Sequence, residues 1–370
     1  MAAMTPLLSE INGILTHAEA QPDFSDFDSL RNKHRVEIIA AFLMSYYHCQ
    51  PQSPRIAELE SQLLRQQTLT GAWLEKSYEP TEPDVGYDGA VPTCFAVLAL
   101  SCAPRSRPDA ITGMVRGADY LYSIEKGGCF FKAKINRTDV LNTNLLAAVT
   151  LMRVADKLPE KSRRIELYRA AARRAVIHVC SSQRYGGAFP YKHHGWRVSF
   201  LYHAMTLALL DMLARYMPLS RSVEVTRFWA ADYLRSIWAG ADFRWAWESC
   251  QDKQGASWTY AWAISSWALT EDPQLENAVA TLRSLRKGYY KNVRSEPFVP
   301  DLFYTAWSLL ALNLTVIFQR QPRAKYRLSV LRWWRLGIAH GRRLLMVMTY
   351  FRNRFLLAWD YLDRGPIEYW

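Results

Sequence analysis

The chain has 370 residues, of which 50% are hydrophobic and 22% charged, and it carries a formal net charge of +12. This composition excludes collagen-like, low-complexity and mostly disordered classes, and the length suffices for one large hydrophobic core. The six cysteines are scattered, without a Cys-x-x-Cys pair or a Cys/His cluster at zinc spacing, so neither a disulfide framework nor a structural zinc site is predicted.

Helices are predicted in pairs along the chain. Residues 1–30 are read as a separate N-terminal segment, and apolar spacing then predicts the following helix pairs: 34–48 with 54–67, 91–102 with 108–125, 139–157 with 161–182, 198–217 with 222–239, 257–269 with 272–286, and 300–318 with 325–348. The first helix of each pair is more uniformly apolar, as a helix buried on all sides is, and the second carries more charge. We therefore predict an all-α fold, an (α/α)6 toroid of six helical hairpins over residues 31–350, with an inner and an outer ring.

The last part of the chain is basic and aromatic. No Asp or Glu lies between Asp301 and Asp360, whereas arginines are frequent there and alternate with Trp, Phe, Leu and Met. Residues 320–370 are expected to complete or flank the toroid. Within them, 320–359 has the composition of a helix on an anionic membrane surface, although a solvated final helix would have the same composition.

A short pattern recurs at the ends of the predicted helices. Its copies are Gln67-Thr-Leu-Thr-Gly71-Ala-Trp73, Ile124-Glu-Lys-Gly-Gly128-Cys-Phe130, Gln183-Arg-Tyr-Gly-Gly187-Ala-Phe189 and Ser284-Leu-Arg-Lys-Gly288-Tyr-Tyr290. A glycine just after a helix is typical of a C-cap. The intact copies resemble the QW repeat of squalene-hopene cyclases and related class II terpenoid cyclases. The six-hairpin architecture is also similar to that of six-hairpin glycosidases, unsaturated-uronyl hydrolases, uronate lyases and sugar epimerases.

Aromatic and polar residues gather where the predicted loops enter the inner helices. In a toroid these loops surround one end of a central cavity. Trp and Tyr rings can stack on sugar faces while polar groups bind hydroxyls, although the same rings also suit a polyene cation. The candidate substrate-binding residues are Asp84, Tyr87, Asn144, Tyr191, Trp196, Trp245, Trp258, Trp262, Asp301, Tyr304 and Trp307.

Several side chains of the same loops are catalytic candidates: His203, Tyr202, His194, Arg197, Asn142, Asp139 and Asp88. The resemblance to uronate lyases and epimerases implies a His or Tyr base, a Tyr acid and an Asn, Arg or His group beside the substrate carboxylate. A hydrolase instead needs two carboxylates, which the aspartates supply. The structural alternative is that His203 and Tyr202 are hydrogen-bonded core residues and that Asp139 and Asp301 are helix N-caps.

The terpenoid-cyclase resemblance makes a sharper demand on the sequence. Those enzymes share an Asp-x-Asp-Asp-Thr motif whose middle Asp protonates the substrate. The nearest match, Asp139-Val-Leu-Asn142-Thr143, has Leu141 at that position, and leucine cannot donate a proton. No magnesium-diphosphate motif, Walker loop or dinucleotide fingerprint occurs either, so neither a metal nor a cofactor is predicted.

We therefore expect a carbohydrate-active enzyme of polysaccharide biosynthesis or modification. Its substrate would be a glycan, uronate-containing or lipid-linked, and its chemistry that of a lyase, epimerase or hydrolase. The alternatives are a terpenoid-cyclase or prenyltransferase-like enzyme on a hydrophobic prenyl substrate, and a non-catalytic glycan-binding toroid. No nucleic-acid-binding module is recognised. Residues 1–26 lack a signal-peptide pattern, so a cytoplasmic protein is expected, with membrane contact at the inner face left open.

Overall fold

The computed structural model describes residues 4–20, 34–76, 86–134, 136–184, 186–193, 195, 198–238, 257–287, 289–290 and 302–319. The inner helices are α2 (Arg35–Cys49), α4 (Ala90–Leu100), α6 (Leu141–Ala155), α8 (Phe200–Tyr216), α10 (Ser257–Thr270) and α12 (Leu302–Gln319). The outer helices are α1 (Met4–Glu19), α3 (Arg55–Arg65), α5 (Pro108–Ser123), α7 (Arg163–Ser181), α9 (Arg221–Ile237) and α11 (Leu275–Ser284).

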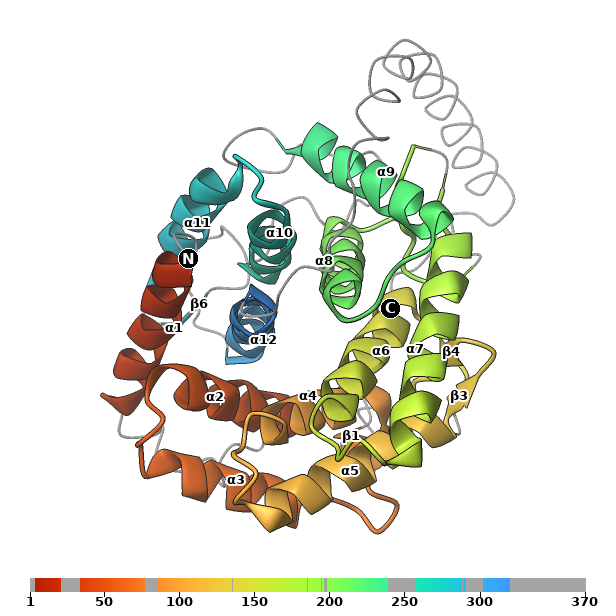
Figure 1. Cartoon of the computed structure of the whole chain (residues 1–370). Coiled ribbons are helices and arrows are strands. Elements are labelled where there is room, and N and C mark those ends of the chain that lie inside the picture. The colour runs from red at the N-terminus through yellow and green to blue at the C-terminus, as the bar shows by residue number, and fades with distance from the viewer. Residues whose placement is uncertain are drawn as a thin grey trace, which may run out of the picture.

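These helices form two concentric rings, seen along the common axis in Figure 1. Each inner helix packs on the next one along the chain, and α12 packs back on α2, which closes the inner ring. Inner helices touch neighbours on every side, so they bury nearly all their side chains, whereas outer helices bury one stripe. The predicted all-α toroid of inner and outer helices is confirmed.

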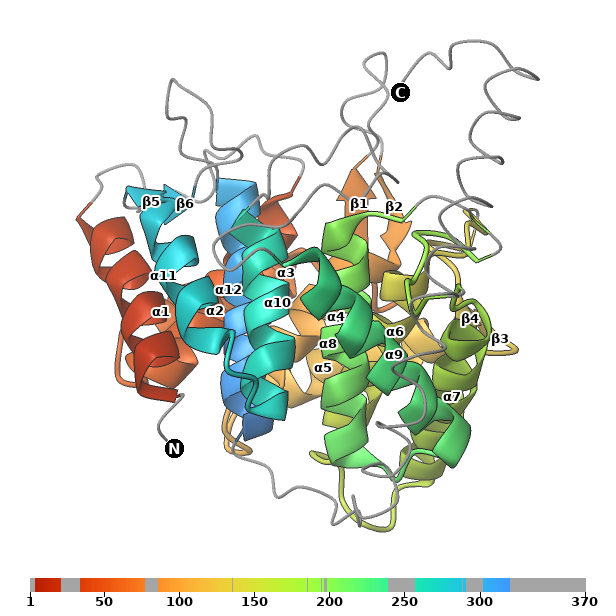
Figure 2. The ribbon, with the colours of Figure 1, turned by 90° about the horizontal axis from the view of Figure 1, so that it is seen from above.

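Three short antiparallel hairpins connect outer helices to the inner helices that follow. They pair β1 (Trp73–Lys76) with β2 (Gly86–Gly89), β3 (Glu125–Lys126) with β4 (Cys129–Phe130), and β5 (Arg286–Lys287) with β6 (Tyr289–Tyr290). Seen from the side, β1–β2 and β5–β6 lie at the same end of the barrel (Figure 2). This end, where the chain enters the inner helices, is called the mouth below.

The outer position beside α12 is occupied by α1, which lies within the N-terminal segment 1–30. α1 packs against α2 and α12. Its Glu10 carboxylate accepts hydrogen bonds from Tyr290 Oη at 2.9 Å and pairs with Arg286 Nε at 2.9 Å. The apolar residues buried by α1 recur with the spacing of one helix face: Leu7, Ile11, Ile14, Leu15 and Ala18. The helix expected at 325–348 and the whole of 320–370 lie outside the described residues.

The two intact Gln–Gly–aromatic turns bind the next outer helix through their glutamines. Gln67 Nε2 donates to the carbonyl oxygens of Gly71, at 2.8 Å, and Gly113, at 2.9 Å. Gln183 Nε2 donates in the same way to Gly187 at 2.9 Å and Thr226 at 2.8 Å. One amide thus closes its own turn and ties it to the neighbouring hairpin.

The glycine of each turn is required by backbone geometry. Gly71, Gly128 and Gly187 have φ values of +91°, +95° and +96°. A Cβ on them would lie 2.5 Å from Arg116 O, 2.5 Å from Arg174 O and 2.1 Å from Trp229 O, respectively. Glycine therefore allows the next outer helix to approach the turn closely.

The aromatic residue of each turn is anchored by the fourth residue of the following inner helix. The backbone N–H groups of Trp73, Phe130, Phe189 and Tyr290 donate to side chains at 3.0, 2.8, 3.1 and 3.0 Å. The acceptors are Thr93 Oγ1, Asn144 Oδ1, His203 Nδ1 and Thr305 Oγ1. Because an unpaired buried N–H is costly, this contact fixes how the chain enters each inner helix.

Within the described part of the chain, every helix is too short or too polar to cross a bilayer.

Candidate functional site

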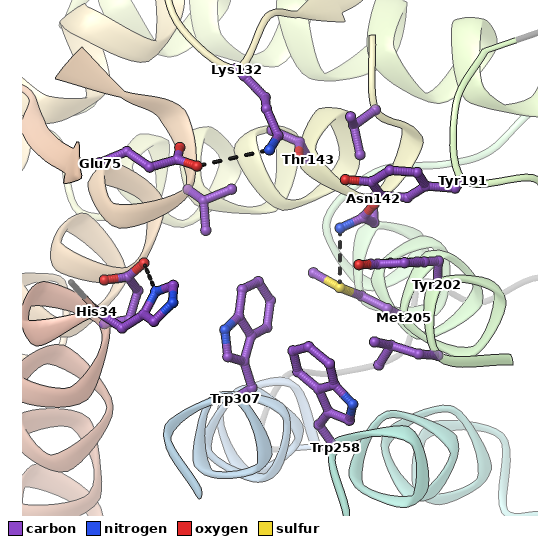
Figure 3. A pocket seen from close by; sticks show the side chains of 14 residues that line it. His34, Glu75, Lys132, Asn142, Thr143, Tyr191, Tyr202, Met205, Trp258 and Trp307 are labelled. Atoms are coloured by element: carbon purple, nitrogen blue, oxygen red, sulfur yellow. Dashed lines mark hydrogen bonds and ion pairs between the residues drawn. The ribbon is translucent and has the colours of Figure 1, made fainter. Parts of the chain in front are cut away.

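A cavity of about 330 Å³ lies at the mouth, enclosed by the first turns of the inner helices (Figure 3). Its volume is at the lower end of the range usual for small-molecule sites. The residues that line it are His34, Glu37, Glu75, Val91, Lys132, Val140, Asn142, Thr143, Tyr191, Leu201, Tyr202, Met205, Trp258 and Trp307. They come from all six inner helices and from the segments that lead into them, so the cavity exists only in the closed toroid.

One part of the lining follows a simple rule of position. Glu75, Lys132 and Tyr191 each stand two residues after the buried aromatic residue of a turn, namely Trp73, Phe130 and Phe189. In an extended segment, side chains two apart point to the same side. Both side chains therefore point inward. The aromatic ring is buried in the core, and the residue two positions later lines the cavity.

The rest of the lining is drawn mainly from the beginnings of the inner helices. Asn142 and Thr143 open α6, Leu201 and Tyr202 open α8, and Trp258 is the second residue of α10. Met205 and Trp307 lie one turn deeper and form part of the floor (Figure 3).

Aromatic rings make up one side of the cavity. The ring centroids of Tyr191 and Tyr202 are 4.2 Å apart, and those of Trp258 and Trp307 are 5.7 Å apart in an edge-to-face arrangement. Phe95 supports Trp307 from below the cavity, with centroids 4.8 Å apart. Such flat, rigid surfaces bind the apolar face of a sugar ring or stabilise a cation.

Ionisable side chains make up the opposite side. Glu75 Oε1 lies 3.8 Å from Lys132 Nζ, and the Glu75 side chain is 11% exposed. Glu75 Oε2 is buried, and the Tyr87 side chain is a neighbour of the Glu75 carboxyl group across the β1–β2 hairpin. Burial raises the pKa of Glu75 above its ordinary value although Lys132 opposes the shift, and the negative charge of Glu37 adds to it. Glu75 is therefore a carboxyl group that keeps its proton to higher pH than a surface glutamate.

A second carboxylate, Glu37, belongs to the same cavity. Its Oε1 is 3.3 Å from His34 Nδ1, one turn earlier at the start of α2. The cavity thus holds two carboxyl groups, one of them with a raised pKa, together with a histidine and a lysine.

The sequence predicted five of these lining residues: Asn142, Tyr191, Tyr202, Trp258 and Trp307. It missed Glu75, Lys132, His34 and Glu37. The spacing of two from each turn aromatic was a signal for Glu75 and Lys132, since Tyr191 has the same position. His34 and Glu37 had no comparable signal, because no Gln–Gly–aromatic turn precedes α2.

His203 lies outside the cavity, which corrects its assignment as a catalytic residue. It is 0% exposed. Its Nδ1 accepts from the Phe189 N–H, so the ring hydrogen is on Nε2, which donates to Ala230 O at 3.0 Å. Burial lowers its pKa to about 4, and the ring is neutral near pH 7. His203 therefore has the structural role that Thr93, Asn144 and Thr305 have in other hairpins.

Three other predicted polar residues also serve the turns and do not line the cavity. Asp88 Oδ2 accepts a hydrogen bond from Thr70 Oγ1 at 2.7 Å. Asn144 donates to Asp139 Oδ1 at 2.8 Å in addition to binding Phe130. These contacts place Asp88, Asp139 and Asn144 in the turns around the mouth, where they support the backbone.

Of the remaining predicted residues, Tyr87 and Tyr304 lie next to lining residues, and Trp262 lies in the core. Tyr87 pairs across the β1–β2 hairpin with Glu75, and its burial together with the Glu75 charge raises its pKa to about 12. Tyr304 packs on Trp258 with ring centroids 5.0 Å apart, whereas Trp262 is fully buried within α10. Asp84, His194, Trp196, Arg197, Trp245 and Asp301 lie outside the described residues.

Comparison with solved structures finds enzymes of three chemistries. An unsaturated glucuronyl hydrolase from Bacillus sp. GL1, responsible for the degradation of glycosaminoglycan, is 13% identical with a TM-score of 0.59, over 84% of this chain and 96% of that one. A D-mannose isomerase is 13% identical with a TM-score of 0.56, over 76% of this chain and 87% of that one. A type II terpene cyclase from Scytonema is 13% identical with a TM-score of 0.50, over 86% and 99%.

This chain has the α/α-toroid fold of these enzymes. No family model and no curated protein matches the sequence. At such low identity the likeness extends to the fold alone, and the chemistry has to be argued from the residues of the cavity.

Proposed function

We propose that this protein is a glycan-acting enzyme that uses general acid catalysis in the mouth cavity, with Glu75 as the acid. The observation that carries the proposal is the state of Glu75: a largely buried carboxyl group that lines the cavity and has a raised pKa. A carboxyl group of this kind keeps its proton to higher pH than a surface glutamate, and in that form it can deliver a proton to a substrate oxygen or an unsaturated carbon.

The two sides of the cavity support a glycan as the substrate. Trp258 and Trp307 supply stacking surfaces for a sugar ring. Lys132 and Asn142 supply a cation and an amide for hydroxyl or carboxylate groups on the opposite side. A wholly apolar substrate would cover these polar groups without forming hydrogen bonds to them, at a cost in binding free energy.

The presence of two carboxyl groups in one cavity favours hydrolysis over elimination or epimerisation. In this scheme Glu75 protonates the substrate at the bond to be cleaved. Glu37, with His34 beside it, accepts a proton from the attacking water. Among the His and Tyr candidates for the base of a lyase or epimerase, His203 is buried away from the cavity.

A second candidate is protonation of an alkene in a prenyl substrate. The aromatic side of the cavity favours it, because Trp and Tyr faces stabilise carbocations. Glu75 would then replace the missing middle Asp of the cyclase motif as the proton donor.

One incubation distinguishes these functions. The purified chain is incubated in D2O with unsaturated-uronyl and saturated oligosaccharides, and separately with linear prenyl substrates, and the products are examined by mass spectrometry. We expect cleaved sugars, with no product from E75Q and normal turnover from E166Q, which changes a glutamate on the surface of α7. Cyclised hydrocarbon carrying deuterium would support the second candidate. Full turnover by E75Q would refute Glu75 as the acid, and binding without turnover would indicate a glycan-binding toroid.

A further inference from the structure

A second cluster of reactive side chains lies next to the mouth cavity. It contains Cys129 from β4, Asp139 from the segment before α6, and His178 from α7. The Cys129 Sγ atom, one carboxylate oxygen of Asp139 and one ring nitrogen of His178 all lie within 4.8 Å of one another. None of the three lines the mouth cavity, and the proposed function does not use them.

The carboxylate and the imidazole of this cluster are already oriented by neighbours. Asn144 Nδ2 holds Asp139 Oδ1 at 2.8 Å, which turns Oδ2 toward His178 Nε2, also at 2.8 Å. The His178 ring stacks on that of His193, with centroids 4.3 Å apart, and His193 Nδ1 is hydrogen-bonded to the Ser182 hydroxyl. Partners that orient ligating side chains in this way are typical of metal sites.

We propose that Cys129, Asp139 and His178 form a zinc-binding site with solvent as the fourth ligand. Thiolate, imidazole and carboxylate together are donors that Zn²⁺ accepts in tetrahedral geometry. Zinc bonds are about 2.0–2.3 Å long, so ligand atoms around one ion are about 3–4 Å apart, close to the present separations. The Asp139 and His178 side chains are 23% and 17% exposed, which leaves a path for the ion.

Zinc binding requires a defined change in protonation at the cluster. The Cys129 thiol loses its proton to solvent as the metal–sulfur bond forms. His178 Nε2 must present a lone pair, so its ring hydrogen has to be on Nδ1. The direct hydrogen bond between His178 and Asp139 is then replaced by two bonds to the metal.

The cluster is connected to the wall of the mouth cavity through the backbone. His193 N–H donates to Asp139 O at 3.2 Å, and Leu141 N–H donates to Tyr191 O at 3.1 Å. An antiparallel bridge joins Val140 to Lys192 between them. Zinc at the cluster would therefore stabilise the segment that carries Tyr191 into the cavity, and this role is independent of which substrate the cavity binds.

Metal titration of the full-length chain tests the proposal. After treatment with a chelator, the protein is titrated with Co²⁺, a spectroscopic substitute for Zn²⁺, and then with Zn²⁺ in competition. We expect about one equivalent of Co²⁺ to bind with a thiolate charge-transfer absorption, and Zn²⁺ to displace it. Zn²⁺ should also raise the Tm.

The variants C129S and H178Q each remove one ligand but keep a side chain that can hydrogen-bond to Asp139. We expect C129S to abolish the thiolate absorption and H178Q to weaken metal binding at least about tenfold. C180S, on the same helix as His178 but outside the cluster, should behave as the unmodified chain. If the unmodified chain binds no Co²⁺ through a thiolate, or if C129S gives the same absorption, the proposal is wrong.

Discussion

The backbone N–H of Phe189 donates a hydrogen bond to His203 Nδ1 at 3.1 Å, and the same contact joins Phe130 to Asn144 at 2.8 Å. In both hairpins the acceptor is the fourth residue of an inner helix and the donor is the aromatic residue of the preceding turn. Histidine is thus one of several residue types that occupy the fourth position of an inner helix and accept this hydrogen bond. This equivalence predicts how its replacements will behave.

Replacement of His203 should affect stability according to the hydrogen bonds that survive. H203A removes partners of both Phe189 N–H and Ala230 O and leaves a cavity, so we expect a loss of about 2–4 kcal/mol in the free energy of unfolding. H203N should lose less, because an amide oxygen fills this position in the preceding hairpin. Chemical denaturation measures both variants, and equal losses would contradict the repeat equivalence.

The same histidine should make stability depend on pH. Its pKa is lowered from 6.5 to about 4 in the folded state, so the unfolded state binds more protons between these values. The free energy of unfolding is therefore highest above pH 6.5. It decreases as the pH falls toward 4, by about 3 kcal/mol in total. Denaturation at several pH values should show a smaller acid slope for H203N, and identical slopes would refute this assignment.

Two adjacent glycines provide a matched test of the turn geometry. Gly186 and Gly187 both have positive φ, of +87° and +96°, but a Cβ on Gly186 would meet nothing within 4 Å. We expect G186A to cost about 1–2 kcal/mol from backbone strain alone. G187A should cost about 3–5 kcal/mol, because its Cβ also collides with Trp229 O. Similar Tm values for the two variants would show that the close approach does not matter.

Replacing Glu75 by glutamine should lower the activity but raise the stability at neutral pH. If it is the general acid, E75Q lowers turnover by about 10² to 10⁴-fold, and the activity of the unmodified enzyme falls as pH rises through the pKa of Glu75. The raised pKa also means that the folded state binds more protons than the unfolded state. Stability therefore decreases as pH rises above the ordinary value of 4.5, and E75Q should have the higher Tm at neutral pH. A lower Tm for E75Q would indicate that the Lys132 ion pair outweighs the burial of Glu75.

Much of the architecture could be predicted because it depends on local patterns. Uniformly apolar helices such as α8 alternate with charged ones such as α7, and the turn glycines mark where outer helices end. The N-terminal helix had the same kind of signal, an apolar stripe from Leu7 to Ala18, but its partner helix α12 is not next to it in the sequence, so the sequence did not reveal its place in the ring.

The contents of the cavity were less predictable because they depend on where each side chain points after the ring closes. Trp262 and Trp258 are four residues apart on α10, yet one is in the core and the other lines the cavity. Polar residues before an inner helix face either the axis or the neighbouring turn, and sequence position alone did not separate Asp88 from Glu75.

The sequence by itself determined the helical hairpins, their inner and outer character and the glycine turns, because these follow from periodicity and from backbone conformations open to few residue types. Only the tertiary structure decided that Glu75, Glu37 and His34 share one cavity and that His203 is buried. Glu37 and His34 stand at the start of α2 and Glu75 lies in β1 after α3, so their meeting depends on how these elements pack, and the pKa of Glu75 is raised by a burial that exists only when the ring is closed.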